Sequence, residues 1–173
     1  MMTITTPEHF VGETSNRTFQ IARQEARKRG SKTVEAEHLL LALASRTTTE
    51  CGRLLIEEGL DRERLDALLQ QERREALAYA GVELRERMPA AGTEGAAPLG
   101  LGTSANEAIR RGAAIGHAEH HVRVGTDLLL GILGAELGTV PRALALAGID
   151  PSALARRVRT ERSSAEKFEK QLD

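Results

Sequence analysis

The sequence has few aromatic residues, which make up 2% of its 173 residues, and it has no tryptophan. Proteins that bind single-stranded nucleic acid stack the bases on aromatic side chains, so this composition argues against that class. A single cysteine, Cys51, excludes an internal disulfide and fits a reducing compartment. No apolar run approaches 18 residues, and no basic segment followed by an apolar one begins the chain. Neither a membrane span nor a secretory signal is expected, and we predict a cytoplasmic protein.

The chain also has no large excess of positive or negative charge, because 24 basic residues nearly cancel 25 acidic ones. This balance gives no footprint for nucleic acid or an anionic membrane, and we expect neither as a partner. The arginines at 110–111 and 156–159 are too interspersed with acids to form a recognition helix for DNA. No G-x-x-x-x-G-K-[ST] motif occurs, so no phosphate-binding loop and no ATP hydrolysis are expected.

An internal repeat is the most informative feature that is present. The segment 37–43, Glu-His-Leu-Leu-Leu-Ala-Leu, recurs at 127–133 as Asp-Leu-Leu-Leu-Gly-Ile-Leu. Downstream, Gly-Leu-Asp at 59–61 recurs as Gly-Ile-Asp at 148–150, so the two copies keep their register. An acidic residue that opens a leucine-rich run, found twice about 90 residues apart, indicates a duplicated helical module.

Helical periodicity and capping residues predict four helices in each copy. Gly30 and Gly59 are expected stops, whereas Asp61 and the pair Asp150-Pro151 have the chemistry of helix starts. No segment alternates as a strand would, so we predict an all-α fold. The expected helices span residues 14–29, 36–45, 49–58 and 61 to about 79, then 104–117, 126–135, 140–147 and 151 onward.

The composition also suggests how the chain is organised. Small and helix-breaking residues dominate positions 88–103, which is typical of a flexible linker. The C-terminal end is highly charged and should continue the last helix before fraying. We therefore expect an N-terminal arm (1–13), a first four-helix repeat (14–87), the linker (88–103), a second four-helix repeat (104–160) and a charged tail (161–173).

Two segments carry a resemblance to a known family. Residues 22–43, with Ala-Arg-Gln-Glu-Ala-Arg followed by Val-Glu-Ala-Glu-His-Leu-Leu-Leu-Ala-Leu, resemble the N-terminal domain of Clp ATPases of the ClpC and ClpA type. Residues 121–131, His-Val-Arg-Val-Gly-Thr-Asp-Leu-Leu-Leu-Gly, are similar to the same signature. The resemblance covers about residues 14–160. It implies eight helices in two four-helix repeats related by a pseudo-twofold axis.

The resemblance also implies a function. Family members use this domain as a non-catalytic docking platform for adaptors and substrates, including proteins marked by phosphorylated arginine. Some are targets of cyclic peptide antibiotics. Because the chain has no ATPase motif, it is either a domain of a longer ATPase or a stand-alone relative. The long linker at 88–103 and the altered signature of the first copy favour a stand-alone relative, with a Clp ATPase, adaptors or substrates as partners. The alternative is a decoy that sequesters a cyclic peptide antibiotic or a substrate from the ATPase.

The acidic residue of the repeated signature is the candidate binding site, and it falls on Glu37 and Asp127. A carboxylate can accept two parallel hydrogen bonds from a guanidinium, and a helix start with the Thr126 hydroxyl beside it offers donors to a phosphate. The resemblance assigns phosphoarginine or peptide binding to Glu37, Thr126 and Asp127. The alternative is purely structural, because threonine caps helices and an acid in the first turn is stabilised by about 0.3–1 kcal/mol without any ligand.

Other candidates have weaker support. Residues 117–121 hold three histidines and a glutamate, but no thiolate or His-Glu-x-x-His pattern accompanies them, so we expect neither a metal nor another cofactor. A small metal-dependent hydrolase would need three inward-facing ligands, and none is convincingly spaced. Cys51 shares an apolar helix face with leucines and should be packed. Phe10 is a possible groove aromatic, with anchoring of the N-terminal arm as the alternative.

Overall fold

A computed structural model describes residues 13–81, 99–119 and 123–172 of the chain. These residues form eight helices and no strand, which confirms the all-α prediction. Most boundaries fall within one residue of those expected, and α6 begins two residues early. The helices are α1 (Glu13–Lys28), α2 (Ala36–Ser45), α3 (Glu50–Glu57), α4 (Arg62–Tyr79), α5 (Thr103–Ala118), α6 (Val124–Leu133), α7 (Thr139–Leu146) and α8 (Pro151–Leu172).

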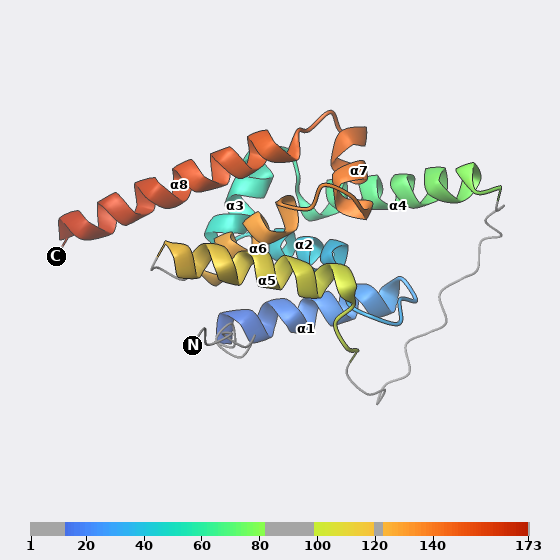
Figure 1. The fold of residues 1–173 in the computed structure, drawn as a ribbon, viewed down its shortest axis with the longest axis horizontal. Coiled ribbons are helices and arrows are strands. Elements are labelled where there is room, and N and C mark those ends of the chain that lie inside the picture. Colours follow the sequence, from blue (N-terminus) through green and yellow to red (C-terminus); the bar gives the residue numbers. More distant parts are fainter. Residues whose placement is uncertain (1–12, 82–98, 120–122, 173) are drawn as a thin grey trace.

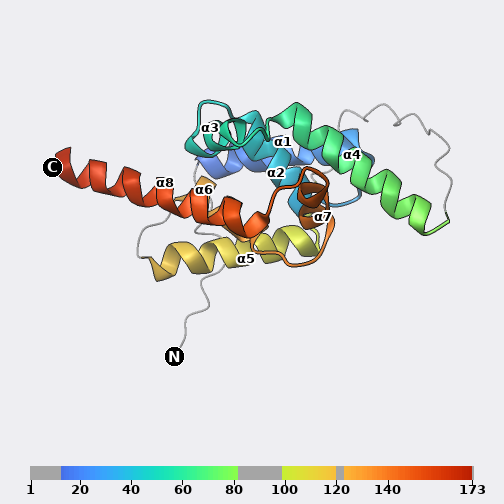
Figure 2. The same ribbon diagram turned by 90° about the horizontal axis from the view of Figure 1, so that it is seen from above.

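The helices form two repeats, α1–α4 and α5–α8, around a shared centre. The second helix of each repeat, α2 and α6, lies in the middle of the molecule, and both are buried along nearly their whole length. Figure 1 shows the two long fourth helices, α4 and α8, extending toward opposite ends. Figure 2 shows α1 and α5 on opposite sides of the centre. This arrangement is the predicted pair of four-helix repeats related by a pseudo-twofold axis.

The repeated landmarks fold alike in the two copies. Gly59 and Gly148 both adopt a left-handed φ of 69°, which ends one helix and turns the chain into the next. The carboxylate of Asp61 then accepts a hydrogen bond from the Arg64 amide at 2.8 Å, and that of Asp150 accepts one from the Ser152 amide at 2.9 Å. These contacts satisfy amides that a helix start leaves unpaired, which explains why α4 and α8 begin where the sequence predicts.

Two glycines bring α5 and α6 together. A Cβ atom added to Gly112 of α5 would lie 2.6 Å from the backbone oxygen of Asp127 in α6. A Cβ atom added to Gly131 of α6 would collide with the backbone of α5 at Ala108 and Gly112. The two backbones can approach this closely only because neither residue has a side chain. Gly131 stands where the first copy has Leu41, so this close packing belongs to the second repeat.

Contacts from distant parts of the sequence join the two repeats. Val34 donates a backbone hydrogen bond to Gly100 at 2.9 Å and accepts one from Gly102 at 2.8 Å, forming an isolated parallel bridge just before α5. Arg142 of α7 pairs with the buried Glu72 of α4, with Nε 2.6 Å from Oε1. Residues 82–98, which include most of the expected linker, and the arm at 1–12 lie outside the described residues.

The described residues have neither of two features that would change the expected function. None of their helices is long and apolar enough to cross a membrane. Within the same residues, no group of three or more histidine, cysteine, aspartate or glutamate side chains is placed to hold a metal ion. His117 is exposed at the end of α5, and the expected histidines at 120 and 121 lie outside the described residues.

Candidate functional site

Two pockets lie at the starts of the central helices α2 and α6. The Glu37 pocket has a volume of about 240 Å³, and residues 35–37 and 138–141 contribute to its lining. The Thr126 pocket has a volume of about 270 Å³, and residues 124–126 and 49–51 contribute to its lining. Each pocket therefore joins the start of one repeat's second helix to the start of the other repeat's third helix. The two are equivalent under the pseudo-twofold axis.

Glu37 lies in the first turn of α2 and is half-buried in the wall of its pocket. Burial raises the pKa of its carboxyl group, and the nearby carboxylates of Glu35 and Glu72 raise it further. The backbone amide of Glu37 and the guanidinium of Arg29 oppose this shift only in part. No ion pair holds this carboxylate among the residues that the structure describes. Glu37 is thus an acid whose charge is poorly balanced from within the chain.

Neighbouring polar groups fix the start of α2 without using Glu37. The Ser104 hydroxyl of α5 accepts a hydrogen bond from the Ala36 amide at 2.9 Å and donates one to the Glu35 carboxylate at 2.5 Å. His38 Nδ1 accepts a hydrogen bond from the Glu35 amide at 2.9 Å. These side chains cap the helix, and Glu37 contributes to the lining of the pocket.

The opposite wall of the Glu37 pocket offers hydrogen-bond donors. Residues 138–141 form the start of α7, where a helix leaves backbone amides without a helical partner and carries a partial positive charge; Gly138, Thr139 and Val140 have such amides, whereas Pro141 has no N–H. Arg111 of α5 also lines the pocket, with Nη1 3.6 Å from the exposed carboxylate of Glu107. The pocket lining therefore combines these anion-favouring groups with three acids, Glu35, Glu37 and Glu107.

Asp127, the counterpart of Glu37, is fully buried. Its Oδ2 accepts a hydrogen bond from the Arg123 amide at 2.8 Å, so Asp127 caps its own helix. This contact explains why α6 begins at Val124 and not at Thr126 as the sequence predicts. Thr126 is also buried, and its hydroxyl donates to the Arg123 carbonyl at 3.2 Å. Thr126 lines the pocket of that name, whereas Asp127 does not.

The other carboxylate oxygen of Asp127 contacts Arg162, a residue that was not predicted from the sequence. Arg162 of α8 places Nη1 2.6 Å from Asp127 Oδ1 and 2.9 Å from Glu119 Oε2. Only 1% of Arg162 is exposed, which is rare for an arginine. The signal was present in the sequence, because Leu154, Val158 and Arg162 follow at intervals of four along the buried face of α8.

The Thr126 pocket contains cations and a thiol. Arg46 and Arg123 line it together with Cys51 at the start of α3. Burial raises the pKa of the Cys51 thiol to about 12, and the carboxylates of Glu50 and Asp127 add to this shift. The thiol therefore stays protonated near neutral pH, as expected for a packed cysteine. Asp127 itself is buried next to Thr126 in the chain and does not line the pocket.

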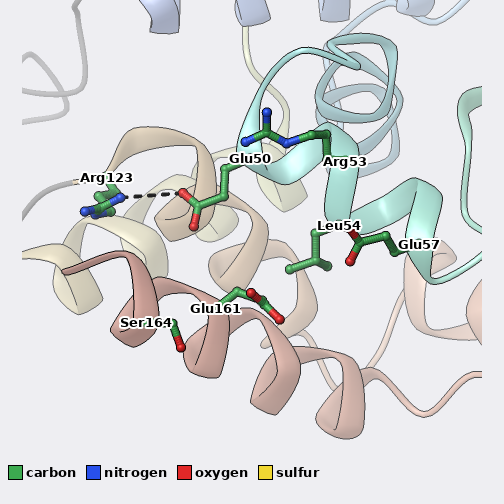
Figure 3. Close-up of a pocket in the computed structure, with 7 residues that line it drawn as sticks. All are labelled: Glu50, Arg53, Leu54, Glu57, Arg123, Glu161 and Ser164. Atoms are coloured by element: carbon green, nitrogen blue, oxygen red, sulfur yellow. Dashed lines mark ion pairs between the residues drawn. The ribbon is translucent and has the colours of Figure 1, made fainter. Parts of the chain in front are cut away.

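A larger groove of about 440 Å³ continues from the Thr126 pocket between α3 and α8. Glu50 and Arg123 line both spaces, and the two side chains pair at 3.6 Å. Figure 3 shows Leu54 and Glu57 of α3 facing Glu161 of α8 across this groove. Its lining mixes charges of both signs, so the groove shows no clear preference for a charged ligand.

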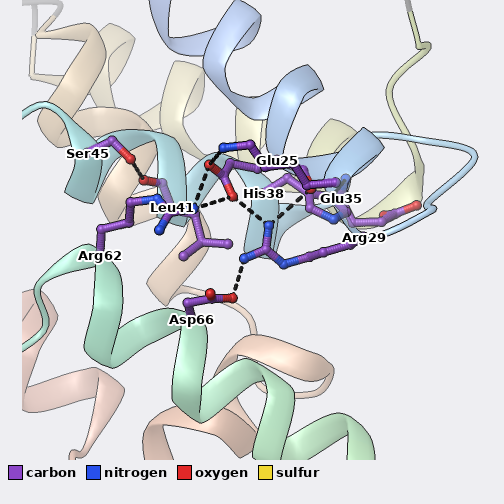
Figure 4. Close-up of polar contacts among 9 residues, drawn as sticks. Glu25, Arg29, Glu35, His38, Leu41, Ser45, Arg62 and Asp66 are labelled. Carbon is purple, nitrogen blue, oxygen red and sulfur yellow. Dashed lines mark hydrogen bonds and ion pairs between the residues drawn. The ribbon is translucent and has the colours of Figure 1, made fainter. Parts of the chain in front are cut away.

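A buried acid in the first repeat shows how this chain neutralises such groups. Glu25 of α1 accepts hydrogen bonds from Arg29 at 2.6 Å, Arg62 at 2.9 Å and Lys28 at 3.2 Å (Figure 4). Burial acts to raise the pKa of Glu25, but these cations outweigh it and lower the pKa to about 2. Arg29 also pairs with Asp66, which ties α1 to α4.

Among the predicted site residues, the structure places Glu37 at an open pocket and Thr126 at the equivalent pocket, whereas Asp127 is buried and lines neither. The two copies of the site are separate and are not brought together into one centre. Phe10, the possible groove aromatic, lies outside the described residues.

Comparison with known proteins bears on the fold. No protein-family model matches the sequence, and no curated protein matches it significantly. The structure is similar to the N-terminal domain of ClpD, a caseinolytic-protease-associated chaperone of Arabidopsis thaliana, with a TM-score of 0.65 and 15% sequence identity. The match covers 93% of this chain and 99% of that one. The protein therefore has the fold of a Clp N-terminal domain, as the repeated signature predicted.

Proposed function

We propose that this chain is a non-catalytic protein-binding domain of Clp-type proteolysis, which receives an arginine-bearing segment of an adaptor or substrate in the Glu37 pocket. One observation carries the proposal. The Glu37 carboxylate lies half-buried at a pocket of about 240 Å³, and no cation of the described chain forms an ion pair with it. A ligand that supplies a guanidinium would relieve this imbalance through two parallel hydrogen bonds.

Among arginine-bearing ligands, the hydrogen-bond donors that line the pocket favour phosphoarginine. When the guanidinium of the ligand binds Glu37, a phosphate on that guanidinium can lie toward the start of α7 and toward Arg111. Amides at a helix start and an arginine are the donors that phosphate groups use in proteins. The same pocket can thus accept both halves of a phosphoarginine side chain.

Calorimetric titration with phosphoarginine tests the proposal. Native protein should bind, and Glu37→Gln should weaken the affinity by about 10- to 100-fold, because a charge-assisted hydrogen bond contributes roughly 1.5–3 kcal/mol. Glu63→Gln is the matched control, since Glu63 also lies in the first turn of a helix and is exposed. Absence of binding by native protein, or equal affinities of native protein and Glu37→Gln, would contradict the proposal.

A further inference from the structure

We propose that Arg162 is a built-in ligand of the second acid site, so that the chain closes one of its two equivalent arginine sites with its own α8. This inference rests on the proposed function and concerns the regulation of the same type of site. Nη1 of Arg162 lies 2.6 Å from Oδ1 of Asp127, and both side chains are at most 2% exposed. The guanidinium occupies the carboxylate that an incoming arginine would use.

The first repeat has the opposite charge at the corresponding turn of its fourth helix. Each fourth helix buries apolar residues over its first two turns and then a charged one, which lies 35 residues after the acid of its own repeat. In α4 that charged residue is Glu72, and in α8 it is Arg162. Glu72 raises the pKa of Glu37, whereas Arg162 pairs directly with Asp127. The duplication thus has one acid, Glu37, whose neighbour Glu72 is a carboxylate paired with Arg142, and one acid, Asp127, that is itself paired with Arg162.

The other groups that line the second site resemble those that line the first. Arg46, Arg123 and the start of α3 line the Thr126 pocket, as Arg111 and the start of α7 line the Glu37 pocket. Asp127 directly follows Thr126, which lines that pocket. Removal of the Arg162 side chain would therefore leave a buried carboxylate beside a pocket that favours anions. This arrangement would resemble the open site at Glu37.

The test compares the number of phosphoarginine molecules bound by four forms of the full chain. Native protein should bind one, and Glu37→Gln should bind it with about 10- to 100-fold lower affinity. Arg162→Ala should bind two, and the double variant Glu37→Gln with Arg162→Ala should bind one, at Asp127. Arg159→Ala is the matched control, because Arg159 is an exposed arginine of the same helix, and it should bind one. Two molecules on native protein, or no additional site in Arg162→Ala, would overturn the inference.

A thermal measurement keeps the test decisive if Arg162→Ala folds poorly. Loss of one partner from a buried ion pair should lower the melting temperature by about 10 °C in a chain of this size. Phosphoarginine should then raise the melting temperature of Glu37→Gln with Arg162→Ala, or restore its helical circular dichroism if it is unfolded. No recovery would overturn the inference. Because this variant lacks Glu37, failure of the inference can be told apart from failure of the proposed function, which native protein and Glu37→Gln test alone.

Discussion

A buried carboxylate must be balanced by a cation or take up a proton, and three acids of this chain differ in this respect. Glu25 accepts hydrogen bonds from three cations, which lower its pKa to about 2 despite burial. Asp127 is paired with one buried arginine and one backbone amide. Glu37 has like charges as neighbours and a raised pKa. Glu25 and Asp127 therefore stabilise the fold through ion pairs, whereas Glu37 is a candidate ligand-binding residue.

His38 should make the stability of the protein depend on pH. Burial, with the Arg29 guanidinium, lowers the pKa of His38 to about 4 from 6.5. As the pH falls below 6.5, the unfolded chain takes up a proton that the folded chain excludes, so stability decreases until the pH reaches about 4. The native protein should lose about 3 kcal/mol over this window from His38 alone.

The measurement is urea unfolding of native protein and His38→Asn between pH 7 and pH 4. The difference between their unfolding free energies should shrink or change sign as the pH falls, because only the native protein carries the His38 contribution. His117→Asn removes an exposed histidine and should leave the slope unchanged. A constant difference between native protein and His38→Asn at all pH values would show that His38 does not titrate as described.

At the scale of single residues, the sequence predicted which acids lie at the starts of the central helices α2 and α6. It did not predict which side chains contact these acids. The repeated signature identified Glu37 and Asp127 as equivalent, and the structure places both in the first turn of the second helix of their repeat. What differs is the neighbour from the fourth helix, Glu72 or Arg162, which lies 35 residues from its acid in either copy. Charges so far apart in the sequence are brought together by packing, and helical periodicity alone does not say which of them meet.

At the scale of elements, helix ends were predictable wherever a local side chain determines them. Asp61 and Asp150 cap α4 and α8 as their chemistry indicated, and Gly30 adopts the expected left-handed φ of 66° after α1. The start of α6 was predicted two residues late, at Thr126. There the cap comes from Asp127, which bonds backward to the amide of Arg123, so the threonine chosen as the cap lies inside the helix.

The close contact of α5 and α6 should make Gly131 intolerant of a side chain. A methyl group at Gly131 would meet the backbone of α5, which cannot move aside as a flexible side chain can. Gly131→Ala should therefore lower the unfolding free energy by roughly 1–3 kcal/mol, as measured by urea denaturation, although alanine favours helices.

Gly134→Ala provides the matched control at the end of the same helix. Its φ is −75°, and an added Cβ atom would have its nearest neighbour at 3.3 Å, so the substitution should be neutral or slightly stabilising. Equal effects of the two substitutions would show that α5 and α6 are not packed through their glycines.

At the scale of the whole molecule, the two repeats share one core. The buried leucines of α2 and α6 belong to a single cluster of apolar side chains that also includes residues of α1, α4, α5, α7 and α8. Each pocket joins residues of both repeats, and Val34 pairs with the segment that leads into α5. The sequence predicted the duplication, yet it did not show that neither copy has a complete pocket or core of its own.

The shared core predicts that the repeats unfold together. Leu129 is fully buried in α6, and Leu129→Ala should cost about 2–5 kcal/mol. If unfolding is cooperative across the molecule, the slowest-exchanging amides of α2 should lose about as much protection as those of α6, roughly 100-fold, in hydrogen-exchange mass spectrometry. Leu137→Ala is the control, because this leucine is 89% exposed and should change neither helix. Loss of protection confined to α5–α8 would mean that the repeats are separate folding units. Each pocket would then be lined by two units that unfold separately, and neither repeat would hold the other's part of the lining in place.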